Sequence, residues 1–374
     1  MALPLEQFCR ERLEEAEKEG LRRALRAWEI KDSRTVSLDG RALINFASND
    51  YLGFSTHPEI RKASADSSGA TASRLLTGNH AAYRELEADL AAFKQLPAAL
   101  VFSSGYAAAI GTIPALVGES DFIVMDKLAH ACLVDGARLS GATLRVFPHN
   151  NLKRCEELVK KCRASDPKAN ILIVTESVFS MDGDLAPLSD LVEIKKRHDA
   201  WLMVDEAHAT GVFGKNGRGG AEHFGVEKEI DVTMGTLSKA LACVGGFIAG
   251  SNVLKDLLIQ RARSMLFSTG LPTGVCRAAQ KAIRVMQKEP EHRAKLWENV
   301  RAFGKHESPI IPIVIGDERA CLEAAEKLLS EGIYVPAIRY PTVAKGKARL
   351  RISLSAAHTK DDMQVLMGII PLFR

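Results

Sequence analysis

Apolar and polar positions follow three different patterns along the chain. Residues 5–28 are rich in Glu and Arg, with Leu21, Leu25 and Trp28 at helical spacing. This pattern predicts one or two amphipathic helices, broken near Gly20. Such helices are marginal alone, so we expect them to pack on another part of the chain or on a second subunit.

Between residues 44 and 270, short apolar runs alternate with helical stretches. Continuous apolar runs of this length, separated by helices, are typical of parallel strands that are buried on both faces. The pattern therefore predicts an α/β domain with a mostly parallel sheet and helices on both of its faces. The runs cover residues 99–102, 122–125, 144–147, 171–175, 201–204, 232–234 and 246–249.

From residue 271 onward the pattern changes again. Two charged helical stretches are followed by apolar runs near 309–315, 334–338 and 349–354, with a helix near 321–330. This order predicts a smaller α+β domain. The expected organisation is an N-terminal helical segment (1–43), a large α/β domain (44–270) and a small C-terminal α+β domain (271–374).

The composition is that of a globular protein with a large core. Hydrophobic residues make up 46% of the chain and charged residues 26%, which excludes a disordered protein. The formal net charge is only +4, so neither nucleic acid nor a membrane is an expected partner. Seven cysteines without a C-x-x-C, and a charged N-terminus without a secretory signal, are typical of reduced thiols in a cytoplasmic protein.

Candidate chemistry follows the predicted strands, because ligands of open parallel sheets bind beyond the carboxyl ends of the strands. After the first run, the small-residue turn at 103–105 opens a helix, whose free N–H groups suit a phosphate. An ordinary strand-to-helix turn would have the same pattern. After the second run, His130 is placed to stack on a planar cofactor, although a capping or core histidine is equally compatible.

Two further strand ends carry ionisable residues. Asp205 ends a buried run, where a carboxylate needs a cation or a donor such as the protonated ring nitrogen of a cofactor. His208 is placed to contact the same ring; the alternative is a helix cap with a surface histidine. Lys239 lies among apolar and hydroxyl residues, where a desolvated amine becomes a nucleophile that forms a Schiff base, unless it is an exposed loop lysine.

Together these features predict a site for pyridoxal phosphate. A phosphate cradle, a stacking histidine, an aspartate for the ring nitrogen and a lysine for the Schiff base are the parts that hold this cofactor. The sequence contains no P-loop, zinc-protease or nucleophile-elbow motif, and the glycine run at 214–220 does not have the dinucleotide spacing. No metal site is expected, because the histidines do not cluster with cysteines.

Asp205, His208 and Lys239 lie within two of five distinctive segments: SNDYLG at 48–53, SRLLTGNH at 73–80, FSMDG at 179–183, VDEAHATG at 204–211 and GTLSK at 235–239. By these segments the chain resembles the α-oxoamine synthases, a branch of the fold-type I pyridoxal phosphate enzymes. The resemblance extends over nearly the whole chain. It implies the aspartate-aminotransferase-like fold, an acyltransferase activity and a homodimer with active sites at the interface.

The resemblance also implies a role for each matching residue. Lys239 would bind the cofactor covalently and act as general base, Asp205 would pair with the pyridine nitrogen, and His130 would stack on the ring. The other cofactor-binding residues would be Gly105 and Tyr106 at the phosphate end, with Ser180, His208 and Thr236 holding the ring oxygen and phosphate. The substrate-binding residues would be Thr342, Arg351 for the amino-acid carboxylate, and Arg23 for the acyl substrate.

Within the family, segments 337–343 and 348–351 are most similar to members that condense L-alanine with a pimeloyl thioester, of coenzyme A or an acyl carrier protein, in biotin biosynthesis. One alternative is a relative with another acyl donor, such as glycine C-acetyltransferase, serine palmitoyltransferase or 5-aminolevulinate synthase. Others are a catalytically silent subunit, which the retained Lys239 argues against, and a non-enzymatic nucleotide-binding protein. Strand alternation leaves open that Arg349 and Arg351 are simply solvated.

Overall fold

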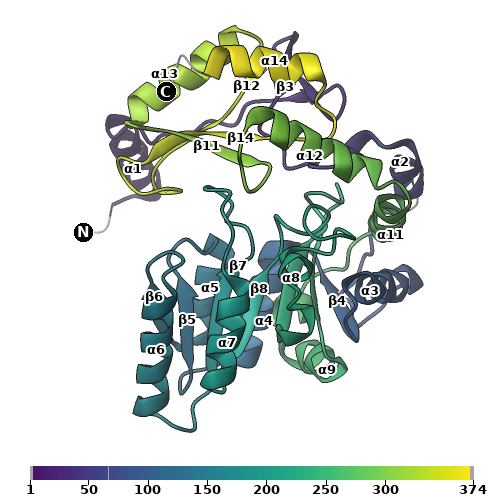
Figure 1. Cartoon of the computed structure of the whole chain (residues 1–374), viewed down its shortest axis with the longest axis vertical. Helices are drawn as coiled ribbons and strands as arrows, with labels where there is room; N and C mark the ends of the chain where they lie inside the picture. Colours follow the sequence, from purple (N-terminus) through teal and green to yellow (C-terminus); the bar gives the residue numbers. More distant parts are fainter. Residues whose placement is uncertain (1–2, 66, 371–374) are drawn as a thin grey trace.

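The computed structural model describes residues 3–65 and 67–370. Its centre is a seven-stranded sheet in which only β10 runs antiparallel to its neighbours (Figure 1). Each of the seven predicted apolar runs forms one strand of this sheet, which confirms the predicted α/β architecture. In spatial order the strands are β4 (Ala98–Phe102), β10 (Gly246–Gly250), β9 (Val232–Thr236), β8 (Trp201–Asp205), β7 (Ile171–Glu176), β5 (Phe122–Asp126) and β6 (Thr143–Phe147).

Helices cover both faces of this sheet because its strands are apolar on both faces. In β7, Leu172 and Val174 pack on one side, while Ile171 and Ile173 pack on the other. The first side is covered by α4 (Gly105–Leu116), α5 (Ala131–Ser140), α9 (Asn252–Arg261) and α10 (Arg263–Leu266), and the second by α6 (Leu152–Ser165), α7 (Leu188–Arg197) and α8 (Gly220–Phe224). A short 3-10 helix, η2 (Glu227–Glu229), precedes β9.

A third core cluster extends from the β4–β10 edge of the sheet to the C-terminal region. It includes helices α2 (Pro58–Ser64), α3 (Ala81–Lys94), α11 (Thr273–Lys288), α12 (Glu291–Phe303), α13 (Glu318–Ser330) and α14 (Lys360–Ile369), with the 3-10 turn η1 (Phe54–Thr56). Among the residues described, no helix is both long and apolar enough to span a membrane.

Two smaller sheets form the upper layer in Figure 1. One is antiparallel, with β14 (Ala348–Ser353) between β11 (Ile310–Gly316) and β13 (Ala337–Ile338). The other joins β1 (Glu29–Ile30), β2 (Thr35–Leu38) and β3 (Arg41–Asn45) to β12 (Ile333–Tyr334). Residues 29–45 therefore contain three strands, of which β3 pairs with β12 of the C-terminal region. The sequence had led us to expect a helical segment up to residue 43.

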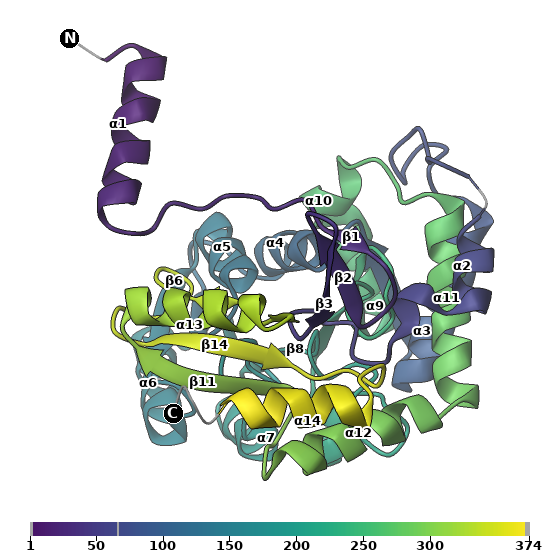
Figure 2. The same ribbon diagram turned by 90° about the horizontal axis from the view of Figure 1, so that it is seen from above.

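Of the one or two helices predicted before residue 29, the structure has one. Helix α1 (Leu5–Lys18) ends before Gly20 as predicted, but residues 21–28 have no regular structure. Helix α1 buries no residue and stands apart from the rest of the chain (Figure 2). A segment as short as 21–28 needs a packing surface to be helical. Residues 21–28 instead run extended as far as Trp28, which packs on Tyr334 with ring centroids 4.3 Å apart.

A buried ion pair lies directly behind the end of β8. The side chains of Lys94 and Glu206 are 3% and 0% exposed, and Lys94 Nζ lies 3.3 Å from Glu206 Oε2. Lys94 also donates to Thr210 Oγ1 at 2.8 Å and to the carbonyl of Arg218. Burial lowers the pKa of Lys94, and the charge of Glu206 opposes that shift. The pair is therefore satisfied on both sides although it is removed from water.

The glycine run at 214–220 wraps this carboxylate. Glu206 Oε1 accepts the N–H of Ala221 at 2.7 Å. Gly219 has a left-handed φ of +132°, and a Cβ built on it would lie 1.4 Å from Glu206 Oε2. The glycines of this run allow the backbone to approach a buried carboxylate. This packing requirement explains why the run is rich in glycine although it does not have nucleotide-binding spacing.

We predict that Lys94→Met lowers the free energy of unfolding by about 3–5 kcal/mol, because it leaves the Glu206 carboxylate buried and uncompensated. Urea unfolding measures the change. Arg319→Met is the control, since it breaks the highly exposed pair with Glu323 and is expected to change stability little. Similar stabilities for both variants would contradict the prediction.

His149 connects the end of β5 to the loop that follows β7. Its Nδ1 lies 3.0 Å from Asp126 Oδ1 at the end of β5, and its Nε2 lies 2.6 Å from Asp184 Oδ2 in the loop. Burial alone would lower the pKa of His149, but hydrogen bonds to Asp126 and Asp184 raise it to about 10. The imidazolium therefore ties down the loop that carries Ser180.

The free energy of unfolding of a His149→Gln variant, compared with wild type over a range of pH, should reveal this bridge. The folded-state pKa of His149 is raised to about 10, so its stabilisation is complete below the unfolded pKa of about 6.5 and is lost as pH rises towards 10. The stability difference between wild type and variant should shrink over this interval. Chemical unfolding at a series of pH values tests it; a difference that is constant with pH would rule out the charged bridge.

Candidate functional site

Parallel strands bring the predicted polar residues to one edge of the large sheet. Asp205 and Thr236 are the last residues of β8 and β9, and Glu176 ends β7 directly opposite Asp205 in the register. His130 follows β5 as the N-cap of α5, and Lys239 follows β9. The structure thus gathers here the residues that the sequence placed at separate strand ends.

Asp205 and Lys239 form the electrostatic centre of this edge. Burial raises the pKa of Asp205, and the nearby charge of Lys239 opposes that rise. Burial lowers the pKa of Lys239, and Asp205 and Glu176 oppose that fall. His130 interacts with both charges, and burial lowers its pKa. A buried carboxylate that faces a cation and an amine with a lowered pKa can stabilise positive charge and accept a proton.

His130 caps a helix, one of the roles that its sequence allowed. Its Nδ1 accepts the N–H of Cys132 at 3.2 Å, which caps α5. The ring is nevertheless exposed and lines a cavity of about 860 Å³. A capped ring held in one orientation at a cavity wall is well placed for stacking.

His208 is a buried histidine, so its reading as a surface residue is wrong. Its Nδ1 lies 2.6 Å from the hydroxyl of Tyr51, which also donates to Asn49 Oδ1 at 3.2 Å. Burial lowers the pKa of His208 well below its usual value and raises that of Tyr51 to about 12. Both side chains are therefore neutral, and the second nitrogen of His208 is available to a ligand.

The N-terminus of α4 has the features of an anion site. Gly105 and Tyr106 lie in its first turn, where N–H groups have no intrahelical acceptor. A Cβ on Gly105 would lie 3.5 Å from Thr236 Oγ1, which in turn lies 2.7 Å from Ser238 Oγ. Two hydroxyls therefore adjoin the helix end. The side chain of Tyr106 turns elsewhere: it is 45% exposed and donates to Asp135.

Residues far apart in sequence line the cavity of about 860 Å³. Arg23, Ser180 and Thr342 share its lining with His130, and Arg23 Nη2 lies 3.5 Å from the carbonyl of Tyr340. Lys239 lines a second cavity, of about 460 Å³, together with residues of the segment 48–50. Four of the predicted site residues therefore line the larger cavity and Lys239 lines the smaller one.

Arg351 lies between these two cavities. Its Nε donates to the carbonyl of Ser180 at 2.6 Å, in the lining of the first, and its Nη2 donates to Asn49 Oδ1 at 3.2 Å, in the lining of the second. Arg349 pairs with Asp182. These arginines are 4% and 6% exposed, so the alternative of a solvated strand face is wrong. That face of β14 is covered by the loop after β7.

Glu176 lies at this edge of the sheet and was not singled out by the sequence analysis. It is buried, and its Oε1 has no hydrogen-bond partner among the described residues. Burial, followed by the charge of Asp205, raises its pKa well above the usual value, and the charge of Lys239 and the backbone of His130 and Ser180 oppose that rise. Its place at the end of a buried strand, like that of Asp205, was the available sequence signal.

These observations fit pyridoxal phosphate. The end of α4 and two adjoining hydroxyls suit the phosphate, Asp205 suits a protonated ring nitrogen, His130 presents a ring at a cavity wall, and Lys239 has the lowered pKa of a Schiff-base lysine.

Comparison with known proteins agrees with the site. A family model described as aminotransferase class I and II matches residues 41–370. The chain is 40% identical to an 8-amino-7-oxononanoate synthase from Alkaliphilus metalliredigens over 373 residues, which cover 96% of this chain and 94% of that protein.

Two solved structures extend the likeness to the fold. A serine palmitoyltransferase from S. paucimobilis with a bound PLP–myriocin aldimine has a TM-score of 0.91 at 29% identity, and covers 99% of this chain and 98% of its own. An 8-amino-7-oxononanoate synthase from Francisella tularensis has a TM-score of 0.74 at 30% identity, and covers 88% of this chain and 96% of its own. The chain therefore belongs to the aminotransferase class I and II family of fold-type I, pyridoxal-phosphate-dependent enzymes, and within it to the α-oxoamine synthases.

Proposed function

We propose that this chain condenses L-alanine with a pimeloyl thioester, with loss of carbon dioxide and of the thiol, to form 8-amino-7-oxononanoate. The observation that carries the proposal is the buried Lys239–Asp205 centre in a chain that is 40% identical, over nearly its whole length, to a synthase of that name. The product name of that relative supplies the substrate class, and the lining of the larger cavity agrees with it.

Pyridoxal phosphate, when bound, supplies an electron-withdrawing ring that stabilises negative charge at the Cα of an attached amino acid. Asp205 would hold its ring nitrogen and His130 would contact its ring face. The first turn of α4, at Gly105 and Tyr106, would hold the phosphate with Thr236. Ser180 and His208 would approach the ring oxygen, and Lys239 would attach the cofactor.

Lys239 is suited to remove the proton from Cα. Burial lowers its pKa, so its amine reaches the neutral form at lower pH than an exposed lysine. The adjacent carboxylates Asp205 and Glu176 then stabilise the ammonium that forms when the proton arrives. One side chain can thus accept the proton and later return it.

Arg351 is suited to hold the carboxylate of L-alanine. Among the described residues, Ser180, Asn49 and Ser353 each accept one of its N–H groups. Arginine has five such donors, so two remain for a planar carboxylate. The three protein contacts fix the guanidinium before substrate arrives.

The larger cavity is suited to an acyl chain that ends in a carboxylate. Apolar Leu128, Val314 and Val343 line it, together with the cationic side chains of Lys127 and Lys347. Arg23 and Thr342 lie in the same lining. Apolar walls accept the methylenes of a pimeloyl group, and the cations favour its distal carboxylate.

We further propose a cytoplasmic homodimer with active sites at the interface. Large apolar side chains are exposed around the cavity that Lys239 lines and on the isolated helix α1, including Val244, Leu75 and Phe8. A second copy would cover such surfaces. All seven cysteines are free, which agrees with a reducing compartment.

Thiol release by the cofactor-loaded protein tests the reaction. We expect release with L-alanine plus pimeloyl-CoA, and little with glycine plus acetyl-CoA or L-serine plus palmitoyl-CoA. Lys239→Ala should lower the rate by about 100- to 10,000-fold, the usual contribution of a general base. Preference for either of the other pairs would assign a different acyl donor and contradict the proposal.

Arg351→Lys should raise the KM for L-alanine by about tenfold or more, because a lysine cannot replace a two-pronged, charge-assisted contact. Steady-state kinetics at saturating thioester measure it. Arg349→Lys is the matched control on the same strand face, and its KM for L-alanine should stay close to wild type, since Arg349 is engaged by Asp182. Equal effects of both substitutions would argue against a carboxylate-binding role for Arg351.

A further inference from the structure

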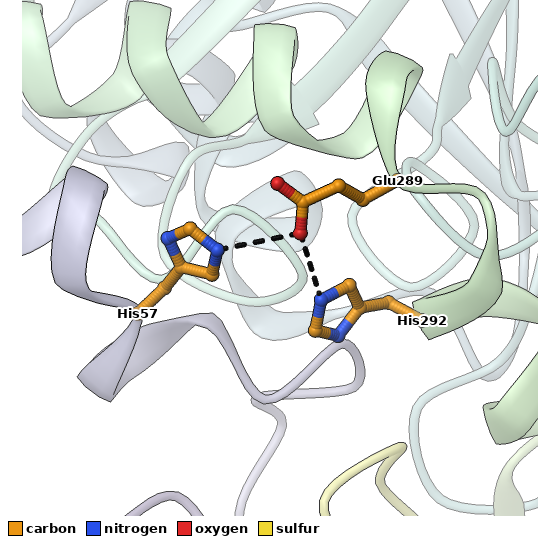
Figure 3. Close-up of side chains that lie close together, drawn as sticks. All are labelled: His57, Glu289 and His292. Carbon is orange, nitrogen blue, oxygen red and sulfur yellow. Dashed lines mark hydrogen bonds and ion pairs between the residues drawn. The ribbon is translucent and has the colours of Figure 1, made fainter.

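Three potential metal ligands converge outside the candidate site described above. His57 is the N-cap of α2, Glu289 follows the last residue of α11, and His292 lies in the first turn of α12. Figure 3 shows both imidazole rings turned towards one carboxylate oxygen of Glu289. That oxygen, Oε2, lies 3.4 Å from His57 Nε2 and 3.2 Å from His292 Nε2, and the three ligand atoms lie within 4.8 Å of one another.

The two measured separations match the edges of a tetrahedral zinc site. Zinc bonds of about 2.0–2.1 Å to nitrogen and oxygen place neighbouring ligands about 3.3 Å apart. The His57–Glu289 and His292–Glu289 separations of 3.4 Å and 3.2 Å lie on either side of this value. The remaining edge, between the two histidines, is no longer than 4.8 Å.

The surroundings of His292 orient it as a ligand. Its Nδ1 lies 3.1 Å from the backbone carbonyl of Leu52, and its Nε2 faces Glu289. A histidine that ligates a metal typically has such a contact on its other nitrogen.

The two histidine rings are held side by side. In His57 the nitrogen that faces Glu289 is Nε2, whereas Nδ1 is buried and has no hydrogen-bond partner among the described residues. Phe54 contacts the rings of both histidines edge-on, with centroids 5.8 Å from His57 and 5.1 Å from His292. The rings are therefore held together, although their side chains stay 14% and 30% exposed and within reach of an ion from solvent.

We propose that His57, Glu289 and His292 bind one zinc ion, with water as the fourth ligand. Two imidazoles and one carboxylate form a donor set that zinc favours over magnesium or calcium. The ion would fasten the start of α2 to the junction of α11 and α12. The segment just before His57 carries Asn49 and Tyr51 of the candidate active site. The proposed zinc ion would therefore have a structural role, in which it holds that segment in place.

Zinc titration of the tag-free, cofactor-loaded protein after chelator treatment tests this proposal. We expect one zinc ion per chain at micromolar free zinc, and a rise in Tm by several degrees. Glu289→Gln and His292→Gln should each abolish both effects. His198→Gln is the control, because His198 contacts only a single carboxylate group, that of Glu156, at 3.1 Å, and it should bind zinc as wild type does.

Cobalt substitution gives a readout that does not depend on the variants folding. The wild type should develop the visible absorption of tetrahedral cobalt, read as a difference spectrum against the cobalt-free holoenzyme. Absence of stoichiometric binding, an octahedral cobalt spectrum, or unchanged binding by a folded His292→Gln variant would each overturn the proposal.

Discussion

Two carboxylates buried side by side at the ends of β7 and β8 are the constraint on which the rest of the site depends. Glu176 and Asp205 repel each other and have lost their water, so each needs compensation from neighbouring groups. It comes from the amine of Lys239 and from the backbone of His130 and Ser180. These groups follow β5, β7 and β9, so the balance exists only when the strands are in their correct order. Folding and assembly of the site are thus one event.

Much of this arrangement could be predicted from the sequence. Seven apolar runs predicted seven strands, because a strand buried on both faces needs a continuous apolar sequence, and the polar residues that follow them predicted the cofactor site. Contacts between distant segments could not be predicted. The two-residue strand β12 pairs with β3 over 280 positions away, and neither leaves a distinctive pattern. Strand alternation left open that Arg351 was solvated, because it shows which residues share a face and not what covers that face. Glu176 was missed because the sequence does not show that the end of its strand is buried.

Separate parts of the chain line the larger cavity. Arg23 and Thr342 come from the two ends of the sequence, whereas His130 and Ser180 follow strands of the large sheet. Arg351 contacts residues in the linings of both cavities. Under the proposed function, a small displacement of the C-terminal sheet would alter the space for the acyl chain and the position of the guanidinium together. Binding of one substrate would then affect the geometry offered to the other.

The buried pair behind β8 has an evolutionary consequence. Lys94, Glu206 and Gly219 fit one another: the lysine neutralises the carboxylate, and the glycine leaves room for it. A lineage that lost the lysine first would retain an uncompensated charge one residue from Asp205, and a lineage that replaced the glycine first would collide with the carboxylate. Only loss of the carboxylate would release the other two positions. The three residues are therefore expected to be inherited as a unit and to covary among descendants of this chain.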